Sequence, residues 1–302
     1  MELQPGRFLL PASVAVAILA ISTASLFVRF AQAEAPSLVI AALRLSLATL
    51  VLLPLVLVRH RTRLRQLARR ELLPAGAAGA LLAVHFAAWI TSLEYTSVVS
   101  SVVLVSTGPL WVALASPLLL KERPSSRVIV GMLMALIGSL VINIGDGYHA
   151  FASLAELAGN RAVFGNGLAL VGAWALAGYL MIGRRLRTGI PLVPYIFLVY
   201  GFAALVLVAA VVVTGQRFSG YPAETYLWIF LLALVPQLIG HSLFNWALRF
   251  FPAALVSIAV LGEPLGSALL AYLVLSEAPG WLTALGGAVV LAGLIISTRR
   301  KV

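Results

Sequence analysis

Ten long apolar segments divide this chain of 302 residues, and they constrain its fold more than any other feature. Each holds about 20 residues, the length at which an α-helix crosses a hydrocarbon layer about 30 Å thick. Helices are required there, because lipid offers no hydrogen-bond partner for backbone N–H and C=O groups. The segments lie at residues 8–30, 36–58, 72–92, 97–120, 124–144, 162–183, 190–214, 223–248, 251–275 and 279–298. The sequence therefore predicts an all-α integral membrane protein with ten transmembrane helices.

The composition argues against a soluble globular domain. Hydrophobic residues make up 62% of the chain and charged residues 10%, whereas a soluble domain has about 25% charged residues. The chain has no cysteine, which excludes disulfides, thiol nucleophiles and thiolate metal sites. The net charge of +11 is spread over short loops between the apolar segments. It indicates membrane topology and contact with lipid headgroups, and we expect no nucleic-acid partner.

The positions of Lys and Arg predict that both termini face the cytoplasm. Most of the 21 Lys and Arg residues fall in loops on the side of the N-terminus, including the run RHRTRLRQLARR at 59–70, while only Arg161 and Arg217 fall opposite. Loops rich in Lys and Arg stay on the cytoplasmic side of a bilayer. The first apolar segment is longer than the hydrophobic part of a signal peptide, so we expect it to remain as a span. The prediction is a multi-pass protein of the inner membrane.

The two halves of the chain repeat each other at a spacing of about 155 residues, which indicates duplication. The matched pairs are Pro109 and Pro264, Glu122 and Glu277, Pro124 and Pro279, Gly131 and Gly286, and Gly138 and Gly293. Because each half holds five spans, an odd number, the second half is expected to lie upside down relative to the first. We expect the halves at 1–150 and 151–302. Inverted repeats of this kind are typical of secondary transporters, whose substrate site lies near the bilayer midplane.

The matched glycines also predict a packing contact. Gly131 and Gly138 lie seven residues apart on one helix face, as Gly286 and Gly293 do. Small residues let membrane helices approach closely, so we expect the fifth and tenth spans to pack against each other. The same face could instead serve as the seam of a dimer, and the sequence leaves monomer and dimer open.

Polar and aromatic side chains inside the spans are expected to line a cavity between the halves. Counting 1.5 Å per residue from the span ends places Glu263 near the midplane. A carboxylate there costs about 2.5–3.5 kcal/mol on insertion scales, so it should face a cavity or a partner. Gln237 and His241 lie four residues apart, as His85 and Trp89 do, so each pair shares one helix face. The predicted substrate-binding residues are His85, Trp89, Trp111, Trp174, Gln237, His241 and Glu263.

Each of these residues also has a structural reading. Glu263 could carry a proton or bind a substrate amine, or it could bond neighbouring helices. The polar faces could form hydrogen bonds between helices, and Trp111 and Trp174 could pack against lipid or helices rather than form an aromatic wall. Arg44 could bind a substrate carboxylate or pair with Glu263, or it could extend toward the membrane surface.

Enzymatic and metal sites are not expected. Two histidines without a third ligand at suitable spacing make a poor metal site, and the sequence contains no HExxH motif. The only aspartate is Asp146, in a predicted outer loop. We therefore expect no enzyme activity, no metal and no cofactor.

These residues carry a resemblance to a known family. Over nearly its whole length the chain resembles the EamA type of the drug/metabolite transporter superfamily, with Pro109 or Glu263-Pro264 in the fourth span of each half and Glu-x-Pro after it. The lining with His85, Trp111 and Trp174 is similar to that of YddG-type aromatic amino-acid exporters. The resemblance implies a path formed by the third, fourth, eighth and ninth spans, with the second and seventh at the periphery. That arrangement argues against Arg44 as a ligand.

The resemblance also implies an activity. We expect a secondary transporter that exports amino acids, aromatic ones by preference, or similar small metabolites by alternating access through a central cavity. An exporter of other metabolites or organic cations, or a channel, is the alternative. Proton coupling through Glu263 is a further hypothesis.

Overall fold

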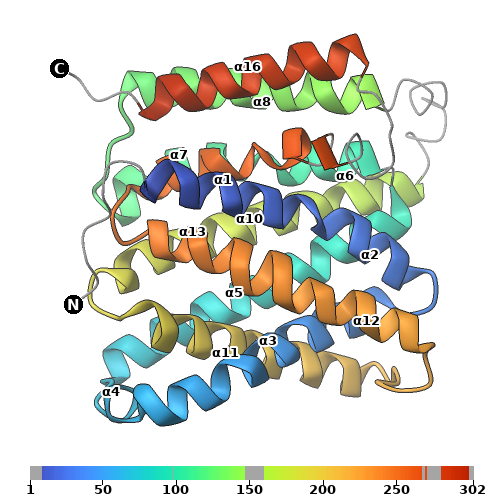
Figure 1. The fold of residues 1–302 in the computed structure, drawn as a ribbon, viewed down its shortest axis with the longest axis vertical. Coiled ribbons are helices and arrows are strands. Elements are labelled where there is room, and N and C mark those ends of the chain that lie inside the picture. Colours follow the sequence, from blue (N-terminus) through green and yellow to red (C-terminus); the bar gives the residue numbers. More distant parts are fainter. Residues whose placement is uncertain (1–8, 97, 147–159, 267–268, 271–279, 299–302) are drawn as a thin grey trace.

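The computed structural model describes residues 9–96, 98–146, 160–266, 269–270 and 280–298, and these residues form helices and connections without any strand. Figure 1 shows the long helices lying side by side across the molecule. In chain order the helices are α1 (Leu9–Ser22), α2 (Ala24–Gln32), α3 (Ser37–Arg59), α4 (Arg61–Arg65), α5 (Arg69–Tyr95), α6 (Val98–Val105), α7 (Gly108–Leu119), α8 (Ser126–Asp146), α10 (Asn160–Arg187), α11 (Leu192–Val213), α12 (Ala223–Leu232), η2 (Ala233–His241), α13 (Ser242–Ala247), α14 (Ala253–Val260) and α16 (Trp281–Thr298).

Seven helical segments of the described chain are long and apolar enough to cross a membrane. They are Ala12–Gln32, Ser37–Arg59, Arg69–Tyr95, Ser101–Leu119, Arg161–Arg187, Leu192–Val213 and Ala223–Ala247. Three shorter apolar helices, at Ser126–Ile142, Ala253–Gly266 and Trp281–Ser297, fall within the predicted spans 124–144, 251–275 and 279–298. The predicted all-helical membrane protein is thus confirmed, while the count of ten stays a prediction.

The proposed boundary between the halves, at residue 150, lies outside the described residues, as do Glu277 and Pro279. The division into 1–150 and 151–302 and the inverted repeat therefore stay predictions.

Helices from before residue 147 pair with helices from after residue 159. The most extensive contacts join α8 to α16, α5 to α10 and α3 to α11, and α1 packs on η2 while α7 packs on α14. Figure 1 shows α8 and α16 lying together at one edge of the bundle. The interior is consequently built where the earlier and later parts of the chain meet.

Glycines set the spacing of the α8–α16 pair. A Cβ added at Gly138 would lie 2.6 Å from the carbonyl oxygen of Gly286, and a Cβ added at Gly286 would lie equally close to the Gly138 carbonyl. Gly131 and Gly293 face each other in the same way. Such contacts are possible only where side chains are absent, so the predicted packing of these two helices is confirmed.

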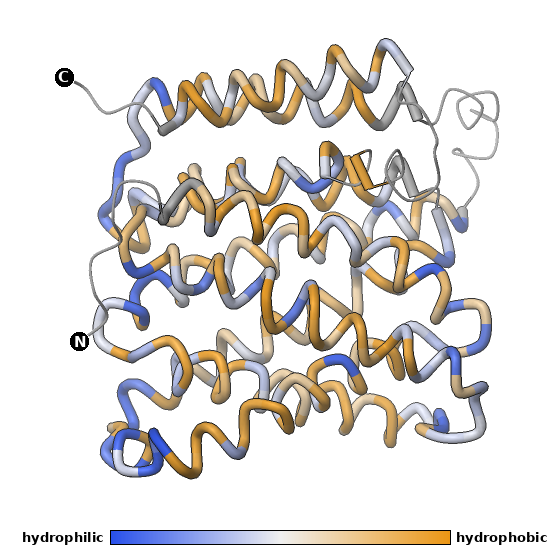
Figure 2. The backbone as a smooth tube through the Cα atoms, in the orientation of Figure 1, coloured by the Kyte–Doolittle hydropathy of each residue, from blue (hydrophilic) through white to orange (hydrophobic). Residues whose placement is uncertain are grey.

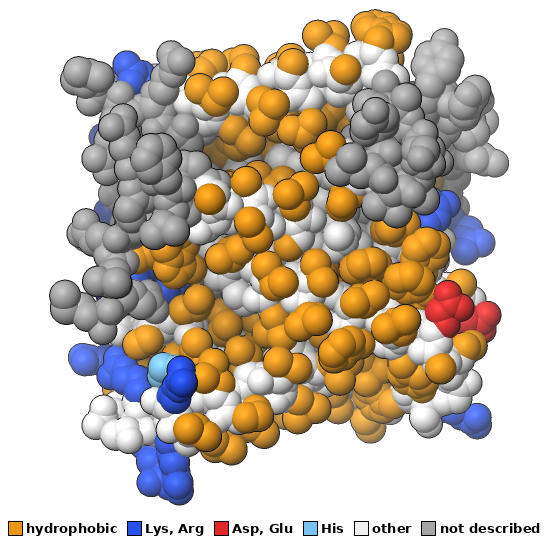
Figure 3. Space-filling view, in the orientation of Figure 1, with side chains coloured by type: hydrophobic (Ala, Val, Ile, Leu, Met, Phe, Trp, Pro, Cys, Tyr) orange, Lys and Arg blue, Asp and Glu red, His pale blue; other side chains and the backbone are white. Residues whose placement is uncertain are grey.

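The outer surface is apolar across the middle and polar at both edges. Figure 2 shows the hydrophobic stretches in the helices and the hydrophilic ones mostly toward the two edges of the molecule. On the face drawn in Figure 3, apolar side chains cover the middle, many Lys and Arg side chains gather at one edge, and Asp and Glu appear at the other. Exposed apolar residues such as Val58, Leu118 and Val213 would be unfavourable in water, and a bilayer accounts for them.

Candidate functional site

A small cavity of about 50 Å³ lies inside the bundle, where helices from both parts of the chain meet. Its lining is mostly apolar, with side chains from α1, α5, α10 and α13 among others. The polar and charged side chains on it are Arg44, His85, Ser106, His241 and Glu263. Ionisable groups inside membrane spans are rare and mark substrate or ion pathways. This convergence makes the cavity the candidate substrate site.

Four of the seven predicted site residues line this cavity: His85, Trp89, His241 and Glu263. Gln237 is fully buried beside it, and its Oε1 accepts a hydrogen bond of 3.0 Å from Nε of Arg44. The structure thus brings together five of the predicted residues, from α5, η2 and the segment after α14.

Trp111 and Trp174 lie together but are not among the cavity residues. Their rings meet edge to face with centroids 5.5 Å apart, and Trp111 Nε1 donates to Thr107 Oγ1. Trp174 is 50% exposed. An aromatic wall formed by this pair stays a prediction.

His85 is fixed by helix α10. Its Nδ1 lies 2.9 Å from the carbonyl oxygen of Gly172. A carbonyl can only accept, so Nδ1 carries a proton and donates it to this contact. The ring also lies parallel to Trp89, with centroids 6.3 Å apart. These contacts hold the imidazole and the indole as one unit on α5.

A π-helical turn separates Gln237 from His241. Residues Ala233–His241 form η2, which contains Pro236, and proline breaks the α-helical hydrogen-bond pattern. A π-turn is wider than an α-turn, but residues four apart still lie on nearly the same side of the helix. Gln237 reaches Arg44 of α3, whereas the His241 ring meets Phe86 of α5 edge to face at 5.3 Å. The two predicted neighbours thus contact different helices.

Arg44 is the residue that the sequence argument discounted. It is fully buried, it lines the cavity, and its guanidinium carbon lies 4.0 Å from the centroid of the Phe86 ring. The second predicted span thus contributes a side chain to the cavity, whereas the resemblance implies that this span lies at the periphery. The signal was present in the sequence, because a charged residue inside a span normally faces the interior of the bundle.

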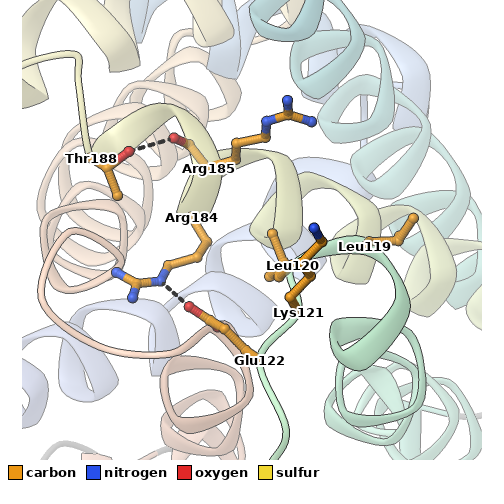
Figure 4. Close-up of a pocket in the computed structure, with 7 residues that line it drawn as sticks. All are labelled: Leu119, Leu120, Lys121, Glu122, Arg184, Arg185 and Thr188. Atoms are coloured by element: carbon orange, nitrogen blue, oxygen red, sulfur yellow. Dashed lines mark hydrogen bonds and ion pairs between the residues drawn. The ribbon is translucent and has the colours of Figure 1, made fainter.

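A second, larger pocket of about 370 Å³ opens where α7 and α10 end. Figure 4 shows its residues, Leu119, Leu120, Lys121, Glu122, Arg184, Arg185 and Thr188. Arg184 Nε donates to Glu122 Oε1 at 2.7 Å, and its Nη1 donates to the carbonyl oxygens of Leu248 and Arg249. One arginine therefore ties the end of α7 to the connection between α13 and α14.

The described residues contain no group of three His, Cys, Asp or Glu side chains that could hold a metal ion. The cavity itself presents a guanidinium, a carboxylate, two imidazoles and aromatic rings.

Comparison with known proteins agrees with this picture. A solved crystal structure, whose description names no function, superposes with a TM-score of 0.78 at 20% identity, covering 97% of this chain and 98% of its own. At that identity the likeness establishes the fold.

Curated relatives are described as uncharacterized transporters. One from Archaeoglobus fulgidus is 22% identical over 70% of this chain and 70% of its own length. YyaM of Bacillus subtilis is 24% identical over 57% of this chain and 55% of its own, and YetK of the same organism is 24% identical over 69% and 62%.

The model of the EamA-like transporter family matches the chain twice, at residues 11–144 and 163–299. These two matches cover most of the sequence and both sets of helices that meet at the cavity. The chain therefore belongs to the EamA-like transporter family, a family of membrane transporters rather than enzymes.

Proposed function

We propose that this protein is a secondary transporter that exports amino acids, aromatic ones by preference, or similar small metabolites across the inner membrane. The observation that carries the proposal is the cavity itself. It collects Arg44, His85, His241 and Glu263 inside a bundle whose other lining is mostly apolar. Opposite charges suit a zwitterion, and the rings of Phe86, Trp89 and Phe244 suit an aromatic side chain.

We propose that transport proceeds by alternating access of two inverted five-helix halves. The proposal is supported by the two separate family matches and by the pairing of early with late helices. A cavity of about 50 Å³ is too small for an amino acid, because ligand pockets usually measure about 300–1,000 Å³. Substrate must therefore enter another conformation, in which the helices around the cavity move apart.

The contact between Glu122 and Arg184 is the proposed closure on the cytoplasmic side. The Lys and Arg residues near it, such as Lys121 and Arg185, place this edge inside by the distribution of positive charge. Breaking the ion pair would remove the link that Arg184 makes between Glu122 and the α13–α14 connection. Opening toward the cytoplasm then requires no change in the helix pairs α8–α16 or α3–α11.

The experiment that tests the substrate class is a competition panel on the purified protein in proteoliposomes. Uptake of labelled L-phenylalanine is measured against an excess of unlabelled amino acids, nucleotide sugars and organic cations. We expect aromatic amino acids to inhibit most strongly. Inhibition by organic cations or nucleotide sugars instead of amino acids would contradict the proposed substrate, although the protein would still be a transporter. Liposomes without protein give the background uptake.

A further inference from the structure

We propose that Arg44 binds a carboxylate group of the transported molecule, so that the substrate must carry one. This inference rests on the proposed transport function and narrows it, because organic cations without an acidic group are then excluded. It concerns a residue in the second span, which the family resemblance had assigned to the periphery.

The first reason is the set of donors that Arg44 leaves unused. A guanidinium has five N–H groups in a rigid planar fork. Nε is occupied by Gln237, but neither Nη1 nor Nη2 has a hydrogen-bond partner in the described part of the chain, although the side chain is fully buried. Two Nη groups side by side match the two oxygens of a carboxylate.

The second reason is that the guanidinium is held in one orientation. The Gln237 amide accepts from Nε on one side, and the guanidinium carbon lies over the face of the Phe86 ring at 4.0 Å. Since Nε requires an acceptor, the amide orientation of Gln237 is also set, and its Nε2 is a donor. These contacts leave the Nη end of Arg44 for a ligand in the cavity.

The third reason is that four unpartnered buried groups on or next to the cavity are donors. Within the described residues, Arg44 Nη1 and Nη2, Gln237 Nε2 and Trp89 Nε1 lack a hydrogen-bond acceptor. Leaving such donors without an acceptor in an apolar interior is unfavourable. Arg44 and Trp89 both line the cavity, so an anionic group bound there can accept hydrogen bonds from their free N–H groups.

The charges on the cavity complete the argument. Glu263 also lines it and is near enough for a Coulombic interaction with Arg44. The two side chains nevertheless form no direct ion pair among those found in the described residues. A guanidinium and a carboxylate on one cavity, apart from each other, fit the carboxylate and the ammonium of an α-amino acid.

The test measures the binding of four probes to purified wild-type protein in lipid nanodiscs. All four probes contain a benzyl group. L-Phenylalanine carries both charges, 3-phenylpropionate only the carboxylate, and L-phenylalaninamide and 2-phenylethylamine only the ammonium. We expect the two carboxylates to bind, and the two probes without a carboxylate to bind at least about tenfold more weakly than L-phenylalanine. Equal binding of L-phenylalanine and its amide would overturn the role of Arg44.

The same series separates this inference from the proposed function. If 3-phenylpropionate binds but L-phenylalanine is neither bound nor transported, Arg44 keeps its role and the amino-acid substrate is wrong. If L-phenylalanine is transported and its amide competes equally, the transport function stands and the inference fails. Absence of binding by all four probes contradicts both.

Variants supply a second readout. Arg44→Gln should bring the affinity ratio of L-phenylalanine to its amide close to one. The ratio for Arg44→Lys should lie between that of Arg44→Gln and that of the wild type. A merely structural arginine would lower both affinities and leave their ratio unchanged. Gln237→Glu places a carboxylate next to Arg44, so it should weaken 3-phenylpropionate binding even if Arg44→Gln does not fold. Unchanged 3-phenylpropionate binding in Gln237→Glu would count against the proposal.

Discussion

Glu263 and His85 were predictable as site residues because polar groups inside a span need a cavity or a partner. Arg44 met the same criterion, yet it was discounted through an argument about whole spans, although each helix has an inner and an outer face. The structure puts Arg44 on the inner face of α3, against Gln237 and Phe86. Contacts between residues so far apart in sequence depend on the packing of several helices, and no spacing rule in the sequence encodes them.

At this scale we predict that His85→Ala and Trp89→Ala each lower the rate of L-phenylalanine transport by about tenfold. Removing either side chain leaves the other without its parallel ring contact, and such contacts contribute about 0.5–1.5 kcal/mol. Initial rates in proteoliposomes measure the effect. Trp281→Ala is the matched control, since Trp281 is 75% exposed on α16, and a loss of rate there as large as for Trp89→Ala would contradict the assignment.

Proton coupling belongs to the same scale. If Glu263 carries the coupled proton, Glu263→Gln should abolish the dependence of transport on an imposed pH gradient while substrate exchange at equal pH continues. The measurement compares uptake with and without the gradient in wild type and variant. A gradient response that survives in Glu263→Gln would assign the proton to another group or to none.

Among the helices, the sequence predicted most spans but not their local geometry. Pro236, for example, lies in an irregular segment. The π-helical register of η2 could not be predicted, because a proline such as Pro236 indicates only that the regular α-helical hydrogen bonding is interrupted. The glycine contact of α8 with α16 was predictable, because glycines at matching positions let two helix backbones approach closely.

That contact gives a prediction about stability. Gly138→Ala places a Cβ 2.6 Å from the Gly286 carbonyl, and overpacking of this kind destabilises by about 1–3 kcal/mol. We expect a lower melting temperature for the purified variant. Gly167→Ala on α10 is the control, because no atom within 4 Å meets its added Cβ; an equal loss in both variants would argue against the close helix contact.

The tie between α7 and α10 gives a prediction about access. We expect Glu122→Gln to increase the reaction of a membrane-impermeant thiol reagent, added from the cytoplasmic side, with a cysteine placed at Leu180 on the cavity. The natural chain contains no cysteine, so labelling reports this position alone. Thr188→Cys, on the exposed pocket, should label equally with and without Glu122→Gln. Unchanged labelling at residue 180 would mean that the Glu122–Arg184 pair does not close the path.

For the whole molecule, the sequence sufficed for an all-helical membrane protein of the EamA-like family. The length of the apolar segments, the positive charge of the loops and the repeated Glu-x-Pro pattern are each spread over many residues. The prediction therefore does not depend on any single side chain. The size and the occupant of the cavity are different, because they depend on a conformational equilibrium. In the proposed mechanism, the cavity of about 50 Å³ represents one closed arrangement of the helices, which also adopt an open one.

The account rests on one claim: two parts of the chain enclose a cavity that carries substrate by opening alternately to each side. Counterflow tests it most directly, in proteoliposomes loaded with unlabelled L-phenylalanine and given labelled L-phenylalanine outside. The account predicts faster, saturable uptake into loaded vesicles than into empty ones, and loss of this difference in His85→Ala. Uptake that rises linearly with concentration and is equal in loaded and empty vesicles would contradict it and indicate a channel.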